Sequence, residues 1–314
     1  MLELVMLRFE AEVTEGGQLP RFIGPTLRGA IGLRLRKITC VTHLPECQGC
    51  ILRFQCPYCR IFEPFLPEGH KFARRLSSMP RPFALRVPKP SDKPIELKCG
   101  DSLNFSMTFL KAMEPIFPYL AIALQQALSS GIGKGVKAKL KLITAGYQSG
   151  DVVIFSPEDG ILRSSLPSVS VEEVMGQPPS GLRRLRVSFV TPTRIDIGGK
   201  LQNPVTFSAL IKAANERGRA LFWAYEGCEP PWDGKALVRS SESVKIEENS
   251  QIWHDYSRFS RRQMERLKIG GVVGSTVYEG DEMGKFLPIL RLMELLNVGK
   301  LTSMGLGQIA VEAI

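Results

Sequence analysis

The sequence predicts an α+β protein made of two tandem ferredoxin-like domains, the first with a cysteine-rich metal-binding insert. Three observations support the fold. Alternating strand-like stretches and helix-like stretches with an apolar stripe follow the order β-α-β-β-α-β, and this order occurs twice. Each half ends with an apolar helix, a glycine-rich turn and a strand. This recurrence indicates an internal duplication.

The first predicted domain covers residues 1–148. Pro25 suits the first turn of its first helix, and five prolines between residues 80 and 94 exclude a helix from the middle of the domain. The predicted elements in order are a strand at 5–13, a helix at 25–37, extended segments at 71–98, a strand at 103–109, a helix at 116–128 and a strand at 139–143.

The second predicted domain covers residues 182–314. Residues 149–181 are rich in Pro and Gly and predict a connector with one short strand at 152–155. The predicted elements of the second domain in order are a strand at 185–189, a helix at 206–224, strands at 237–246 and 269–278, a helix at 287–298 and a strand at 306–314.

Length and charge set limits on function. The chain of 314 residues suits two domains of ordinary size. No apolar run is long enough to span a membrane, and the N-terminus lacks the pattern of a secretory signal, so we expect a cytoplasmic protein without a membrane partner. The 41 Lys and Arg residues outnumber the 31 Asp and Glu residues, which gives a net charge of +10. This excess favours a polyanionic partner.

Five of the seven cysteines lie in the insert at 40–59. Two C-x2-C pairs and an additional upstream Cys favour a metal over disulfides in an intracellular chain. Four thiolates hold a structural zinc ion and equally hold an iron–sulfur cluster. A structural zinc is our first expectation, an iron–sulfur cluster the second, and free buried thiols the alternative. The candidate ligands are Cys40, Cys47, Cys50, Cys56 and Cys59.

A basic and aromatic stretch at 253–268 indicates nucleic acid. Aromatic faces stack on bases and arginines bind phosphates, as in RNA-recognition (RRM) domains, which share the predicted topology. The alternative is a strand edge with buried aromatic residues and a solvated basic face. The candidate RNA contacts of this stretch are Arg258, Arg261, Arg262 and Lys268, interleaved with Trp253, Tyr256 and Phe259.

The glycine-rich stretch at 297–308 is a second candidate for RNA binding. Its glycines allow tight turns and a close approach by another molecule, and its Lys and hydroxyl side chains suit phosphate. The alternative is an ordinary turn between a helix and a strand. The candidate contacts are Gly299, Lys300, Thr302, Ser303, Gly305 and Gly307.

Four stretches carry a resemblance to a known family. They are 27–32 with the cysteines at 40, 47, 50 and 56 and the segment 61–63; 189–194 with 204–207; 256–263 with the glycines at 270, 271 and 274; and 299–307. Together they resemble the CRISPR-associated endoribonucleases that process precursor CRISPR RNA. These belong to the superfamily of repeat-associated mysterious proteins (RAMPs), here in a cysteine-containing branch.

The resemblance implies one cut within a CRISPR repeat RNA that needs no metal or other cofactor and leaves a 2′,3′-cyclic phosphate. This chemistry requires a base at the 2′-OH, an acid at the leaving oxygen and cations around the phosphate. The family often has a histidine after the first helix, and His43 stands at the matching position with Lys37 as a charge partner. His254 with Tyr256 is the second catalytic candidate, and His70 the third.

Two other functions fit parts of the sequence. A RAMP subunit that holds guide RNA without cutting it has the same basic and glycine-rich features. A metal-stabilised DNA-binding regulator fits less well, because no basic helix with helix-turn-helix spacing is evident. The implied partners are CRISPR repeat RNA and precursor CRISPR RNA. Other CRISPR-complex subunits and a second copy of the chain, in a homodimer, are further candidates.

Overall fold

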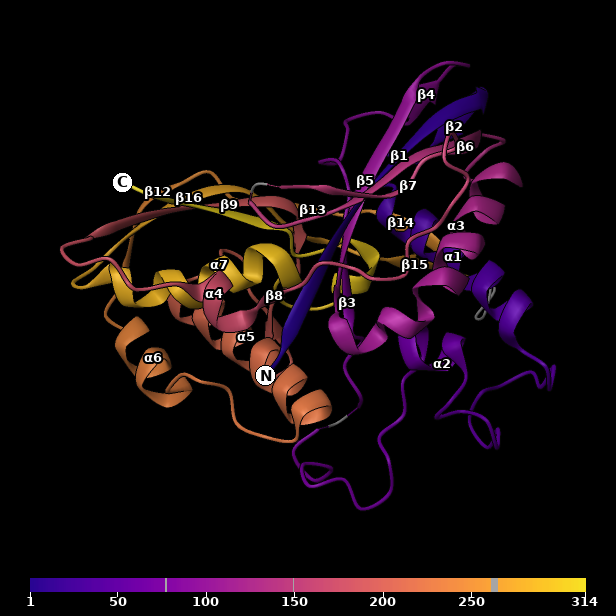
Figure 1. Ribbon diagram of the computed structural model, residues 1–314. Helices are drawn as coiled ribbons and strands as arrows, with labels where there is room; N and C mark the ends of the chain where they lie inside the picture. The colour runs from indigo at the N-terminus through magenta and orange to yellow at the C-terminus, as the bar shows by residue number, and fades with distance from the viewer. Residues whose placement is uncertain (77, 149, 261–264) are drawn as a thin grey trace. The chain divides into compact units, whose positions relative to one another are not determined.

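Two antiparallel sheets with the same strand order form the framework of the protein (Figure 1). The computed structural model describes residues 1–76, 78–148, 150–260 and 265–314, and only the backbone within 257–268. The chain divides into two compact units: an N-terminal unit, Leu2–Val169, and a C-terminal unit, Ser170–Ile314 with Met1.

The N-terminal unit contains a sheet in the order β3-β5-β1-β6-β7. Its four main strands therefore stand in the order second, third, first, fourth, which confirms a ferredoxin-like arrangement. Phe9 of β1 lies opposite Phe105 of β5 and Ile143 of β6. The elements are β1 (Glu3–Glu15), β2 (Gly17–Leu19), α1 (Gly24–Thr39), α2 (Pro57–Phe62), β3 (Phe83–Arg86), β4 (Ile95–Leu97), β5 (Ser102–Leu110), α3 (Phe117–Ser129), β6 (Lys137–Ala145) and β7 (Val152–Phe155), with a 3-10 turn at Lys111–Ile116 and the short β8 (Val169–Ser170) at the boundary.

Helices α1 and α3 pack together against one face of this sheet. Pro25 lies in the first turn of α1, and Arg36 and Lys37 lie in its last turn, where basic side chains interact favourably with the helix dipole. The Phe9 and Phe105 rings stack with their centroids 5.0 Å apart in the core below the helices. The predicted connector residues at 152–155 form β7, which pairs with β6 and so belongs to the first sheet.

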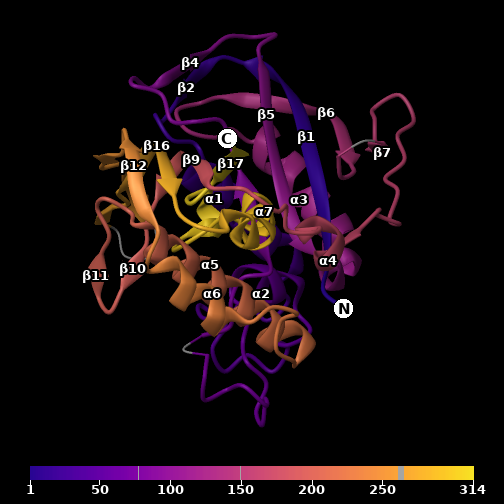
Figure 2. The ribbon, with the colours of Figure 1, turned by 90° about the vertical axis from the view of Figure 1, so that its left-hand side faces the viewer.

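The C-terminal unit repeats this arrangement with a sheet in the order β12-β16-β9-β17. Figure 2 shows these strands side by side, with α5 and α7 on one face. The elements are α4 (Val171–Met175), β9 (Arg184–Thr193), β10 (Asp196–Ile197), β11 (Lys200–Leu201), α5 (Phe207–Leu221), α6 (Gly234–Ser241), β12 (Lys245–Asn249), β13 (Ile252–His254), β14 (Ser257–Ser260), β15 (Glu265–Lys268), β16 (Gly271–Glu279), α7 (Leu287–Leu296) and β17 (Ile309–Ala313), with a π-helical turn at Phe222–Glu226 and 3-10 turns at Met283–Phe286 and Thr302–Met304.

The core of the C-terminal unit is built around Phe207, at the start of α5. Its ring centroid lies 5.0 Å from that of Tyr278 and 4.9 Å from that of Phe286. Tyr278 is fully buried, and its hydroxyl donates a hydrogen bond of 2.8 Å to the carbonyl of Val205. The polar end of this large ring is therefore satisfied inside the core.

One predicted element of the C-terminal unit is wrong. The stretch at 237–246 was expected to be a strand, but its first part belongs to helix α6 and the strand begins at Lys245. The side chain of Asp233 caps the helix by accepting hydrogen bonds of 3.0 Å from the N–H groups of Lys235 and Ala236. A capping carboxylate three to four residues before the apolar stretch is the signal that favours the helix.

In the described parts of the chain, no helix is long and apolar enough to cross a membrane.

Candidate nucleic-acid interface

The glycine-rich loop between α7 and β17 is closed by its own backbone. The N–H of Val298 donates to the carbonyl of Gly307 at 2.8 Å, and the buried side-chain amide of Asn297 donates to the carbonyl of Leu306 at 3.0 Å. Gly307 adopts a φ of +75°, and a Cβ there would overlap the carbonyl oxygen of Val298. The glycine is therefore required by the loop's own fold.

Hydrogen bonds connect the same loop to the end of β9. The N–H of Lys300 donates to the carbonyl of Arg194 at 2.9 Å, and the N–H of Gly307 donates to the carbonyl of Pro192 at 3.0 Å. The Thr191 hydroxyl donates to the carbonyl of Gly305 at 2.7 Å. These bonds fix the loop against the sheet, so its exposed groups are held in place before any ligand binds.

Lys300 is the exposed charged group of this loop. Its ammonium lies 2.6 Å from a carboxylate oxygen of Asp196, and this hydrogen bond and charge lower the pKa of Asp196. Thr302 and Ser303 are only 6% and 3% exposed. Their hydroxyls are therefore turned away from solvent in this structure, and their contact with RNA stays a prediction. Gly305 and Gly307 are likewise buried, whereas Gly299 is half-buried.

The basic stretch forms a hairpin of β14 and β15. In this hairpin Arg258 pairs with Leu267 and Ser257 with Lys268. Arg258 and Lys268 thus lie on opposite strands of one ribbon, and their side chains are not described. Arg261 and Arg262 lie outside the described residues.

His254 lies in β13, beside this hairpin and next to β16. Its ring stacks on that of Tyr256, with centroids 6.2 Å apart and an interplanar angle of 23°. Tyr256 is buried and His254 is half-buried. Arg194, which follows β9, donates a side-chain hydrogen bond of 3.2 Å to the carbonyl of Gly270. Because His254 is paired with Gly271, Arg194 links the histidine region to the glycine-rich loop.

Arg194 is a residue to which the sequence alone assigned no role. It follows β9 directly, within a stretch that carries the family resemblance. Its backbone carbonyl anchors Lys300 while its side chain anchors Gly270. The sequence offered one signal for this role: Arg194 is a basic residue directly after a predicted strand.

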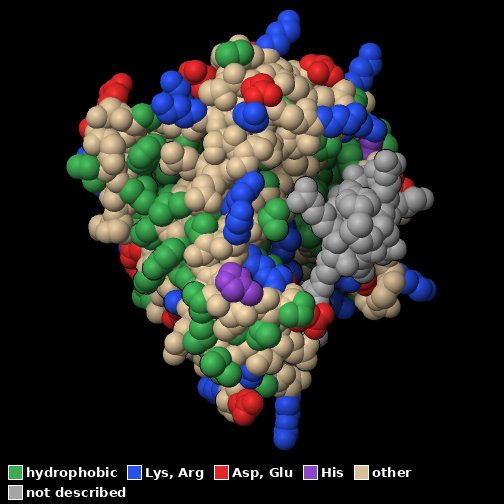
Figure 3. Space-filling view, turned by 90° about the vertical axis from the view of Figure 1, so that its right-hand side faces the viewer, with side chains coloured by type: hydrophobic (Ala, Val, Ile, Leu, Met, Phe, Trp, Pro, Cys, Tyr) green, Lys and Arg blue, Asp and Glu red, His purple; other side chains and the backbone are tan. Residues whose placement is uncertain are grey.

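His43 and Lys37 belong to the N-terminal unit, where α1 ends. Both side chains are exposed, and His43 has a φ of +52°. The loop that carries His43 is tied to α1 by Arg36, which donates to the carbonyls of Leu44 and Pro45 at 2.6 and 2.8 Å. Figure 3 shows Lys and Arg side chains among apolar ones on the side of the molecule where α1 lies. The catalytic role of each histidine stays a prediction.

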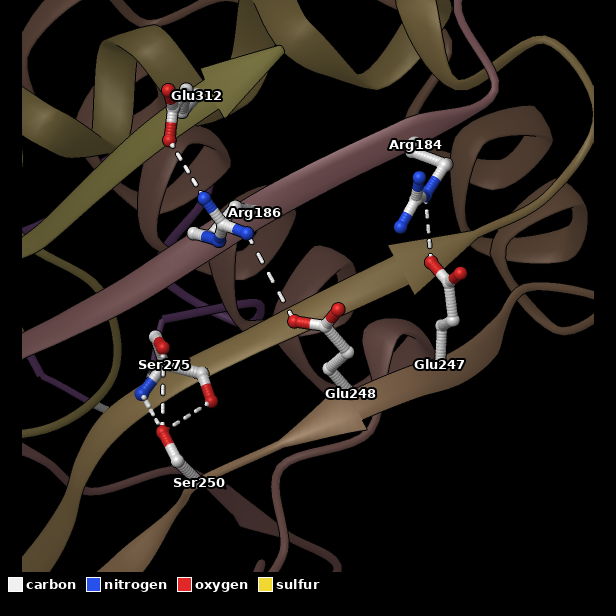
Figure 4. A network of polar contacts seen from close by, with 7 residues as sticks. All are labelled: Arg184, Arg186, Glu247, Glu248, Ser250, Ser275 and Glu312. Carbon is white, nitrogen blue, oxygen red and sulfur yellow. Dashed lines mark hydrogen bonds and ion pairs between the residues drawn. The ribbon is translucent and has the colours of Figure 1, made fainter. Parts of the chain in front are cut away.

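Ion pairs join Arg and Glu side chains on one face of the C-terminal sheet, called here the open face because α5 and α7 lie on the other (Figure 4). Arg184 of β9 lies 2.7 Å from Glu247, and Arg186 lies 3.9 Å from Glu248 and 3.4 Å from Glu312. The aromatic residues of β9 and β16, Phe189 and Tyr278, are buried. This face therefore differs from an RRM surface, which offers aromatic rings for base stacking.

The five cysteines of the insert line one cavity between α1 and α2. Although burial opposes it, hydrogen bonds from the His43 N–H, Thr42 and Arg36 lower the pKa of the Cys40 thiol. Burial and a hydrogen bond with Cys47 raise the pKa of Cys59.

Two comparisons with protein-family models match the two units separately. Residues 2–167 match a family described as an N-terminal domain, AF_1859_N, and residues 187–309 match the CRISPR-associated endoribonuclease Cas6. No curated protein is significantly similar to the chain.

Solved structures of Cas6 proteins have the same fold. A Cas6 (TTHB231) product complex has a TM-score of 0.56 at 16% identity, covering 98% of this chain and 99% of that chain. A Cas6 (TTHA0078) product complex has a TM-score of 0.54 at 18% identity, covering 99% and 100%. In a partial Cas6-RT-Cas1–Cas2 complex the TM-score is 0.56 at 12% identity, and the match covers all of this chain but 46% of the other.

The chain is thus a protein of two tandem ferredoxin-like units, with the fold of solved Cas6 proteins. Its residues 187–309 belong to the family of CRISPR-associated endoribonucleases described as Cas6.

Proposed function

We propose that this protein cuts precursor CRISPR RNA once within each repeat, without a metal, and leaves a 2′,3′-cyclic phosphate. The observation that carries the proposal is the match of residues 187–309 to the Cas6 endoribonuclease family. That range contains His254, the β14–β15 hairpin and the glycine-rich loop. The net charge of +10 suits an RNA substrate.

The chemistry needs no external nucleophile, because the 2′-OH of the RNA attacks the adjacent phosphate. Catalysis then consists of orienting this hydroxyl, moving two protons and stabilising the charge on the phosphate. His43 and His254 are the candidates for proton transfer. Lys37 lies six residues before His43, at the end of α1, and Arg194 binds the carbonyl of Gly270 in the strand region of His254. Both are cations of the kind that the phosphate requires.

RNA binding is assigned to the hairpin and to Lys300 of the glycine-rich loop. The loop is held rigidly by its bonds to Arg194 and Pro192, so that binding costs little ordering of the backbone. The ion-paired open face of the C-terminal sheet is not part of the proposed RNA contact, since its two arginines, Arg184 and Arg186, face three glutamates. Lys300 faces the single carboxylate of Asp196, and its side chain is 57% exposed. Other CRISPR-complex subunits and a second copy of this chain remain predicted partners.

The test is cleavage of a labelled cognate repeat RNA in EDTA, read on denaturing and native gels. We expect a single cut with a cyclic-phosphate end. His43→Ala and His254→Ala are compared separately, and a true catalytic histidine lowers the single-turnover rate by about 10²-fold or more while RNA affinity is kept. His70→Ala tests the third candidate and should keep the cleavage rate, because the His70 ring accepts a hydrogen bond from the Phe72 N–H at 3.2 Å within its own loop.

Three outcomes contradict parts of the proposal. A native-gel shift with intact RNA favours the RAMP subunit that binds without cutting. Cleavage that requires a divalent metal excludes the metal-independent mechanism. Full activity of both His43→Ala and His254→Ala excludes both histidines as the essential proton-transfer groups.

A further inference from the structure

The insert between α1 and α2 surrounds a cavity of about 240 Å³. All five cysteines of the insert line this cavity, although they span twenty residues of sequence. Cys47 and Cys50 are each 7% exposed and Cys59 is 1% exposed. The insert therefore converges on one sulfur-lined space in a segment with little apolar core of its own.

The sulfur atoms are distributed around the cavity in two groups. The Cys59 thiol is hydrogen-bonded with those of Cys47 and Cys56. The hydroxyl of Thr42 lies 3.6 Å from the sulfur of Cys50 and 3.9 Å from that of Cys40, and so bridges the other two cysteines. The five thiols are thus grouped as three and two around one cavity.

This space has room for more than a single zinc ion. Four thiolates at about 2.3 Å from zinc lie roughly 3.8 Å from one another, which leaves no room for a water molecule among them. A cavity of about 240 Å³ holds several water molecules or a small polyatomic group. Among the described residues, no three His, Cys, Asp or Glu side chains are placed to hold one ion together.

Positive charge and hydrogen-bond donors are present where thiolates need them. Arg36 lies beside Cys40 and Cys47, and its guanidinium stands 5.7 Å from the centre of the Tyr58 ring. The sulfur of Cys40 accepts hydrogen bonds from the His43 N–H and from Arg36. Such donors offset the negative charge of a thiolate-ligated iron–sulfur cluster.

We propose that this cavity holds an iron–sulfur cluster ligated by Cys40, Cys47, Cys50 and Cys56. Cys59 is the residue left over, because it lies inside α2. Each of the four ligands lies outside a helix, at a turn or a helix cap, where its thiolate can turn toward the cluster. The cluster is structural: it closes the loop at 40–56 onto the end of α1, and it takes no part in RNA chemistry.

The experiment uses the full chain, produced with iron and sulfide supplied and purified without oxygen. We expect iron, acid-labile sulfide and a broad visible absorption band that fades in air. Changing Cys40, Cys47, Cys50 or Cys56 to Ser singly should remove most of the iron. Cys59→Ser should keep it, as should the matched controls Cys99→Ser and Cys228→Ser, whose thiols are exposed and lie outside the insert.

The wild-type chain alone can overturn the proposal, whatever the variants do to folding. Stoichiometric zinc without iron, or no metal at all, refutes the cluster. Loss of iron in Cys59→Ser with retention in Cys40→Ser refutes the ligand assignment. A circular dichroism melt of each variant separates loss of the cluster from loss of the whole fold. Because the readouts involve no RNA, the result is independent of the proposed endoribonuclease activity.

Discussion

Asn297 at the end of α7 offers a sharp test of how the glycine-rich loop is held. The residue has φ 57° and ψ 160°, a region that is almost exclusive to glycine and costs other residues about 1–3 kcal/mol. Its fully buried side chain donates to the carbonyl of Leu306 at 3.0 Å. The hydrogen bond thus holds a strained backbone in place.

The change to Ala removes this donor and keeps the strain. An unsatisfied buried carbonyl costs about 1–3 kcal/mol, so we expect Asn297→Ala to lower the free energy of unfolding by about 2 kcal/mol. The change to Gly loses the same bond but relieves the strain, against about 0.5–1 kcal/mol for the greater freedom of glycine in the unfolded chain. Asn297→Gly should therefore be less destabilising by about 1 kcal/mol.

The assay is urea unfolding followed by fluorescence and circular dichroism, together with thermal melting. At about 2–4 °C per kcal/mol, Asn297→Ala should melt roughly 4–8 °C below the wild type. Asn104→Ala, at an exposed position on β5, is the control and should shift the free energy by less than about 0.5 kcal/mol. A Gly variant that is as unstable as the Ala variant would refute the role of backbone strain.

Three further predictions concern the C-terminal unit. Gly307→Ala should destabilise it by about 3 kcal/mol or more in urea unfolding, because the new methyl group overlaps the carbonyl of Val298 at a positive φ. Arg186→Ala should leave repeat-RNA affinity within about two-fold in filter binding, because its charge is already paired on the open face of the sheet. Lys300→Met should weaken RNA binding and reduce its salt slope by about one, as expected for loss of one phosphate contact. Lys300→Met should also return the pKa of Asp196 toward its ordinary value. In the folded wild type, Asp196 stays ionised to a lower pH than in the unfolded chain. The stability that Lys300 adds is therefore present above about pH 4 and is lost as the pH falls through the lowered pKa of Asp196.

Each of these predictions has a control or a result that would contradict it. Gly198→Ala also places a side chain at positive φ, but in open space, and should cost only about 1 kcal/mol. A many-fold loss of affinity in Arg186→Ala would instead make the open sheet face an RNA-binding surface. If melting curves of Lys300→Met and the wild type differ equally at pH 3 and pH 6, the Lys300–Asp196 pair does not act through this ionisation.

Local patterns in the sequence were sufficient for much of the fold. Alternation of apolar residues identified β1, β5 and β9 because one face of each strand is buried. The metal-binding insert that the C-x2-C pairs indicate stays a prediction. The helix α6 was missed because its apolar residues are few, and its start depends on the capping carboxylate of Asp233 rather than on a periodic stripe.

The sequence by itself determined the two β-α-β-β-α-β units, the glycine-rich turns and the clustering of cysteines, since each is written in neighbouring residues. Only the tertiary structure decided which side chains of those segments are exposed to a ligand. It buried Thr302 and Ser303 and left Lys300 exposed, because the loop's hydrogen bonds run to β9, more than a hundred residues earlier. It also paired Arg186 with Glu312 across the sheet, and no local pattern encodes the register that brings these two charges together.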